Sequence, residues 1–182
     1  MKQSQDVANS FLGEAINSNI GSIKMLPYRP AQNDELIHGI PRLFVVQAGT
    51  IEGIFYEDKI KKLNFNTGDV VFCSSDGYFY INAHKGSKYF SLSYYGDFVR
   101  FVGRIKADED ELYYFHTDQA IPEAGNCLLQ ALEILSKTQE QQYIWVALVN
   151  SLLKISQEAI KQMSSGKYHS ARLWVEPDSV NN

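Results

Sequence analysis

The sequence has few of the residues that mark several large protein classes. Its two cysteines among 182 residues, Cys73 and Cys127, are too few for a disulfide framework and predict reduced, buried thiols in a cytoplasmic protein. No lysine or arginine run forms a basic stripe, and the net charge of -4 makes this chain alone a poor electrostatic match for nucleic acid. No window approaches the roughly 18 apolar residues of a membrane span, and the polar residues 1–6 predict no signal peptide.

Motifs of strong catalytic chemistry are absent as well. The sequence contains no glycine-rich phosphate loop, no paired CxxC, no HExxH motif and no nucleophile elbow. Its histidines, His38, His84, His116 and His169, are scattered, and a lone histidine is more often a hydrogen-bonded structural residue than a ligand or a base. We therefore predict no catalytic residue, no metal site and no cofactor.

Short strand-like runs dominate the middle of the chain. β-Branched and aromatic residues recur between Gly, Asn, Asp and Ser turns, which is typical of a small antiparallel sandwich or barrel. The acidic run 106–111 is expected to be a solvated loop. The expected strands cover residues 23–26, 42–49, 51–56, 60–65, 70–73, 78–83, 88–95 and 112–115.

After Pro122 the apolar residues recur with the period of helices. Leucines at helical spacing predict one helix that ends near residue 137, and a longer helix follows over 141–163. The longer helix carries two adjoining apolar stripes, whereas a helix on a domain surface needs one. Either it is clamped between the first helix and the sheet, or the extra stripe forms a homodimer seam. We favour a dimer interface made by Trp145, Leu148, Val149, Leu152, Ile155 and Ala159.

These elements divide the chain into four segments, and the expected fold class is mainly β with C-terminal α. The first segment is an N-terminal arm or short helix, the second an antiparallel barrel, and the third a two-helix dimerisation segment. The fourth is polar and is interpreted as a linker toward a C-terminal domain that is not in this chain. The segments cover residues 1–22, 23–116, 117–163 and 164–182.

The barrel segment resembles a cupin, which is a double-stranded β-helix or jelly roll. The resemblance is carried by the hydrophobic strand 43–49 that ends in Gly49, by Gly68-Asp69 before the strand 70–72, and by the turn 74–77. When these glycines are aligned, the metal-ligand positions of cupins fall near Leu36, His38, Arg42 and Phe79. Only His38 could bind a metal, and a divalent ion needs three or more such ligands. The resemblance therefore implies a metal-free barrel.

A metal-free cupin followed by two helices and a linker is similar to the N-terminal effector-binding and dimerisation domain of AraC-family transcription regulators. The similarity covers residues 23–160. It implies a cytoplasmic homodimer whose barrel binds a small-molecule effector, with DNA bound by a separate C-terminal double helix-turn-helix domain. Arg42 and Tyr78 or Tyr80 lie where sugar-binding members have their arginine and aromatic residues. Phe79 and Ser91 replace the histidines of those members, which argues against a sugar.

The predicted ligand is a small, mostly apolar molecule with a carboxylate. Alternation should turn the more apolar side chains of each strand toward the interior. Arg42, if it points inward, would bind the carboxylate through its bidentate fork. The alternative is that Arg42 faces solvent at the rim and that the aromatic residues are ordinary core. The predicted site comprises His38, Arg42, Phe44, Val46, Phe72, Tyr78, Phe79, Tyr80, Ile81, Phe90 and Leu92.

Two other functions are compatible with the same elements. One is a small stand-alone cupin enzyme, a metal-dependent isomerase or dioxygenase, which predicts bound metal. The other is a cupin used only for assembly, which predicts a dimer that does not respond to ligands.

Overall fold

The computed structural model describes residues 10, 13–18, 20–26, 40–56, 60–75, 79–108, 111–136, 142–162 and 172–177. Residues 13–16 are helical, and ten strands and two longer helices are assigned. The strands are β1 (Ser22–Met25), β2 (Arg42–Ala48), β3 (Thr50–Tyr56), β4 (Ile60–Asn66), β5 (Asp69–Cys73), β6 (Phe79–Ala83), β7 (Lys88–Tyr94), β8 (Phe98–Asp108), β9 (Glu111–Ala120) and β10 (Arg172–Pro177). The helices are α2 (Glu123–Ser136) and α3 (Gln142–Gln162).

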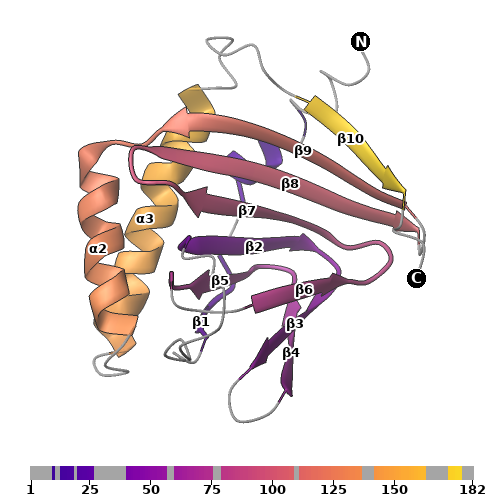
Figure 1. Cartoon of the computed structure of the whole chain (residues 1–182), viewed down its shortest axis with the longest axis horizontal. Coiled ribbons are helices and arrows are strands. Elements are labelled where there is room, and N and C mark those ends of the chain that lie inside the picture. Colours follow the sequence, from indigo (N-terminus) through magenta and orange to yellow (C-terminus); the bar gives the residue numbers. More distant parts are fainter. Residues whose placement is uncertain are drawn as a thin grey trace, which may run out of the picture.

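The strands form two separate sheets. The larger has the order β1-β5-β2-β7-β8-β9-β10, and the smaller has the order β4-β3-β6. In Figure 1, α2 and α3 lie side by side on one flank of the strands, away from the smaller sheet. The prediction of a mainly β chain with two C-terminal helices is confirmed. The described strands do not close into a barrel, and β1 runs parallel to β5 although only antiparallel pairing was expected.

The chain crosses between the two sheets at three glycines. Gly49, Gly68 and Gly86 have φ values of 71, 90 and 76°, and they connect β2 to β3, β4 to β5 and β6 to β7. These left-handed values favour glycine because it has no Cβ to clash. The first two corners are joined, since Thr67 N donates to Gly49 O at 3.1 Å and Gly68 N donates to Val46 O at 2.8 Å.

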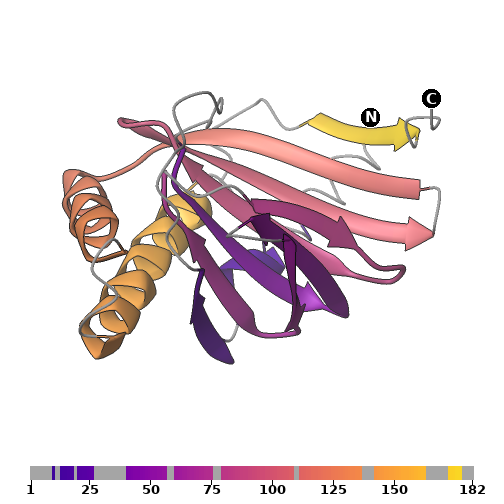
Figure 2. The same cartoon turned by 60° about the horizontal axis from the view of Figure 1, so that its bottom comes forward.

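Alternation along the strands gives the large sheet two differently packed faces. The helix face packs against α2 and α3, and we call the opposite face, which packs against the small sheet, the inner face (Figure 2). Strand residues buried on the helix face are Leu43, Val45, Val70, Phe72, Phe90, Leu92, Tyr94, Val99 and Phe101. Those buried on the inner face are Phe44, Val46, Val71, Cys73 and Tyr89, which meet Ile51 and Phe65 of the small sheet.

Several local predictions need correction. The acidic run 106–111 is not a loop throughout, because β8 extends to Asp108 and β9 begins at Glu111. The polar tail 164–182 contains β10, which pairs antiparallel with β9. Cys73 and Cys127 are both free thiols, but only Cys73 is buried. Among the described helices, none is long and apolar enough to cross a membrane.

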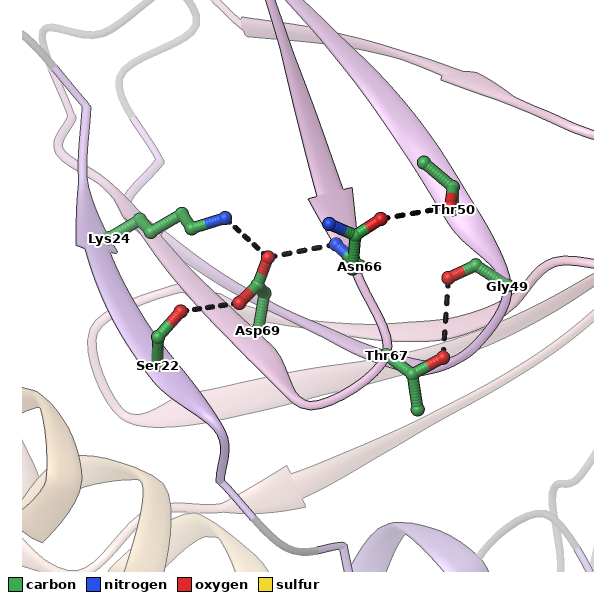
Figure 3. Close-up of polar contacts among 7 residues, drawn as sticks. All are labelled: Ser22, Lys24, Gly49, Thr50, Asn66, Thr67 and Asp69. Carbon is green, nitrogen blue, oxygen red and sulfur yellow. Dashed lines mark hydrogen bonds and ion pairs between the residues drawn. The ribbon is translucent and has the colours of Figure 1, made fainter.

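Asp69 fastens β1 to the corner between β4 and β5 (Figure 3). Its carboxylate accepts hydrogen bonds from Ser22 Oγ, from Lys24 Nζ at 2.5 Å and from the backbone N of Asn66 at 2.8 Å. Burial by itself would raise the pKa of Asp69, but these hydrogen bonds and the charge of Lys24 together hold it below its usual value. The anionic form is therefore the one that stabilises the fold.

Replacing Asp69 with asparagine should lower the free energy of unfolding by about 1–3 kcal/mol at neutral pH, because charge-assisted hydrogen bonds are lost. A carboxylate with a depressed pKa contributes its full stabilisation above the unfolded pKa of about 3.9. That contribution is lost as the pH falls through the folded pKa. The difference in the free energy of unfolding between wild type and Asp69→Asn, measured by urea unfolding, should therefore become smaller in acid. A gap that stays constant down to strongly acidic pH would contradict this assignment.

The matched control for this experiment is Asp118→Asn. Asp118 also pairs with a cation, Arg100, but its side chain is 43% exposed. Exposed ion pairs contribute about 0–1 kcal/mol, so this variant should lose less stability than Asp69→Asn.

Candidate ligand-binding face

Cross-strand register places a row of polar side chains across the inner face. Arg42 pairs with Cys73 on β5 and with Ser93 on β7. Ser93 pairs in turn with Arg100 on β8, and Arg100 pairs with Asp118 on β9. Directly paired residues of antiparallel strands project from the same face. Two arginines from distant parts of the chain therefore share one side of the sheet.

Two arginines of β8 have contacts within the described structure. Arg100 donates from Nε and Nη2 to the two carboxylate oxygens of Asp118 at 2.7 and 2.9 Å, and this hydrogen bonding raises the pKa of Arg100. The guanidinium carbon of Arg104 lies 5.8 Å from the ring centroid of Tyr89, and its Nη1 lies 3.5 Å from Ser91 Oγ. A cation over an aromatic ring is attracted to the ring face. Asp118 thus balances the charge of Arg100, whereas Arg104 has no carboxylate partner among the described residues.

Arg42 has neither a carboxylate partner nor an aromatic ring beside it in the described structure. Within the described residues its side chain forms no ion pair, hydrogen bond or ring contact. It is half-buried at the start of β2, beside the buried side chains of Cys73 and Ser93. A guanidinium presents a rigid fork of donors that matches a carboxylate. This end of the inner face therefore presents an unneutralised cation.

The thiol next to Arg42 is buried, which disfavours its thiolate form. Burial raises the pKa of Cys73 to about 12, with the positive charge of Arg42 opposing the shift and the carboxylate of Glu133 adding to it. Glu133 comes from α2 and accepts a hydrogen bond from the backbone N of Ser75 at 3.1 Å. The thiolate is the nucleophilic form of cysteine. Cys73 therefore acts as a buried apolar residue of the inner face.

The apolar residues predicted to share one interior are divided between the two faces. Phe44 and Val46 project from the inner face, and Ile81 of the small sheet is half-buried in the same cluster. The helix face holds Phe72, Phe90 and Leu92, which pack with the helices. The prediction of a single interior is wrong because the most apolar strand faces are those that the helices cover.

The aromatic residues around β6 do not complete the predicted pocket. Tyr80 is 58% exposed. Phe79 begins β6, but its side chain lies outside the described part of the structure, as do Tyr78 and His38.

Sequence reasoning missed the polar residues of the inner face, chiefly Ser91, Ser93 and Arg104. A signal for the two serines was present, because alternation in β7 separates Tyr89, Ser91 and Ser93 from the apolar set. That apolar set was assigned to the ligand, whereas the structure gives it to the helices. Arg104 could not be found this way, since no strand was predicted where β8 lies.

The predicted dimer interface lies largely inside the chain. Trp145, Val149, Leu152 and Ala159 are at most 5% exposed, while Leu148 and Ile155 are half-buried. The solvent face of α3 carries Tyr143, Ala147, Asn150, Ser151, Lys154, Glu158 and Lys161. The alternative of a clamped helix therefore describes α3, and the six residues of the predicted dimer interface form no continuous outer seam.

Neither a metal-ligand group among the described residues nor a known relative is found for this chain. Within the described residues, no three His, Cys, Asp or Glu side chains come together in a group that could hold a metal ion. No protein-family model, curated protein or solved structure matches this chain.

Proposed function

We propose that this chain is the ligand-sensing and dimerisation module of an AraC-type transcription regulator, with a cupin-like arrangement of its two sheets. The order of parts supports this proposal, because two sheets are followed by α2 and α3. On this proposal, the homodimer and the DNA-binding C-terminal domain belong to the complete regulator. Sedimentation velocity tests for the homodimer, and the reading frame after Asn182 tests for the C-terminal domain.

The effector is a small acid that binds on the inner face with its carboxylate at Arg42. The observation that carries this proposal is the half-buried guanidinium without a partner among the described side chains. Phe44 and Val46 lie on the same strand face, where they are buried against the small sheet, and Ser93 places a hydroxyl beside Arg42. A mostly apolar wall with few placed polar groups is the usual composition of small-molecule sites.

Arg42→Ala should weaken the binding of such an acid by about 10- to 100-fold, because a charge-assisted hydrogen bond contributes about 1.5–3 kcal/mol. Thermal shift with a panel of aromatic and aliphatic acids measures this loss. At 100 times its dissociation constant, a ligand stabilises the native state by about 2.7 kcal/mol. The methyl ester of each acid should give a much smaller shift in the wild type.

Lys154→Ala is the matched control, since Lys154 is an exposed cation on α3. It should leave every shift unchanged. Equal shifts for the acids in wild type and Arg42→Ala would remove Arg42 from the site. If no acid shifts the wild type, the acidic effector is ruled out.

A further inference from the structure

β2 contains a bulge at Gln47. Val46 pairs with Tyr89 and Ala48 pairs with the adjacent Lys88, so Gln47 is an extra residue with no counterpart on β7. A bulge changes the direction of a side chain, and bulges are over-represented beside functional sites. The position of Gln47 is therefore set by the backbone and not by ordinary strand alternation.

Gln47 lies in the wall of a cleft of about 550 Å³, which is lined by residues of the N-terminal segment and of the corner between β4 and β5. Figure 3 shows this corner at Thr67, next to Gly49. Small-molecule sites have volumes of roughly 300–1,000 Å³, so the cleft is large enough for a ligand. Its walls include Glu14, Ser18, Ile20, Val46, Gln47 and Gly68.

The carboxamide of Gln47 is unpaired at both ends. Its Oε1 and Nε2 are buried, and neither has a hydrogen-bond partner in the part of the chain that is described. Leaving buried polar atoms unpaired is unfavourable. Ser87, Gln119 and Trp145 also have an unpaired buried atom, but none of them lines this cleft. Gln47 alone among these four leaves both a donor and an acceptor unused beside an open volume.

The charges at the cleft favour a neutral ligand. Glu14 in the wall forms an ion pair with Lys88, whose side chain is 18% exposed. That pair offers no free charge, while the half-buried Ile20 provides apolar surface. The terminal torsion of glutamine is soft, so its amide can turn toward a molecule in the cleft.

We propose that this cleft binds a small neutral molecule that carries an adjacent donor and acceptor, as in a lactam, a primary carboxamide or a nucleobase edge. Gln47 pairs with that edge through two hydrogen bonds, with Nε2 donating and Oε1 accepting. The two sites meet at Val46, but this cleft opens beside the corners at Gly49 and Gly68, does not include Arg42, and takes an uncharged group.

The test is a titration of isotopically labelled protein with uracil, nicotinamide and caprolactam, followed by NMR. The side-chain amide signals of Gln47 are assigned by their loss in Gln47→Met, which keeps the length and removes the pairing edge. At least one probe should shift these signals and bind with a dissociation constant below about 1 mM. Binding should weaken about tenfold or more in Gln47→Met, and the N-methylated form of the probe should bind as weakly to wild type.

A second measurement separates binding from a structural role. Without ligand, Gln47→Met should melt at a higher temperature than wild type, because it removes unpaired buried atoms. The control Gln130→Met, at an exposed position of α2, should change neither melting nor binding. Arg42→Ala should leave probe binding intact, which keeps this site distinct from the proposed effector site. The proposal is overturned if no probe binds, if Gln47→Met binds equally well, or if Gln47→Met melts lower.

Discussion

Replacing Leu152 with glutamate should unfold the chain and not release a folded monomer. Leu152 is fully buried in the cluster where α3 meets the large sheet. Losing a buried leucine costs about 2–5 kcal/mol, and an unpaired buried charge adds to that. Domains of this size are stable by only about 5–15 kcal/mol. Circular dichroism and sedimentation velocity should together show lost structure.

Asn150→Glu is the control for this substitution, because Asn150 is exposed two residues earlier on the same helix. It should change stability by no more than about 0.5 kcal/mol. A folded, monomeric Leu152→Glu would contradict the internal position of Leu152 and restore the dimer seam predicted from the sequence.

Replacing Phe72 with alanine should lower the free energy of unfolding by about 3–5 kcal/mol. Phe72 is 2% exposed, and its ring meets that of Trp145 edge-on, with centroids 6.0 Å apart and planes at 69°. Such pairs add about 0.5–1.5 kcal/mol beyond the area they bury. This contact helps to fasten α3 to the sheet, so chemical denaturation should show the loss directly.

The conservative variant Phe72→Leu separates core from ligand site. It should retain most of the stability and should bind the acids that wild type binds, because Phe72 faces the helices. Tyr80→Ala, at a site 58% exposed, should leave stability nearly unchanged. If Phe72→Leu lost acid binding while remaining folded, Phe72 would belong to the ligand site after all.

Strands and helices were predictable because their signals are local. The period in the sequence predicted a helix over 141–163, and α3 spans Gln142–Gln162. The run 60–65 was expected to be a strand, and β4 spans Ile60–Asn66. β10 was missed because the tail as a whole is polar, although Leu173, Trp174 and Val175 form a short strand-like run that pairs with β9.

The candidate site was predictable only in part. Alternation can say that Arg42, Phe44 and Val46 share a face, since this follows from neighbours in one strand. It cannot say whether that face meets helices or another sheet. The choice made from apolarity placed Phe72, Phe90 and Leu92 in the ligand site, and the structure places them against the helices.

By itself, the sequence determined the turns at Gly49, Gly68 and Gly86 and the two C-terminal helices, because glycine conformation and apolar spacing act over a few residues. Only the tertiary structure decided that these turns are crossings between two sheets, and that most residues of both α3 stripes are buried within one chain. The physical reason is that burial depends on partners far apart in sequence. Ser22 and Asp69, which are 47 residues apart and hydrogen-bonded, illustrate this dependence.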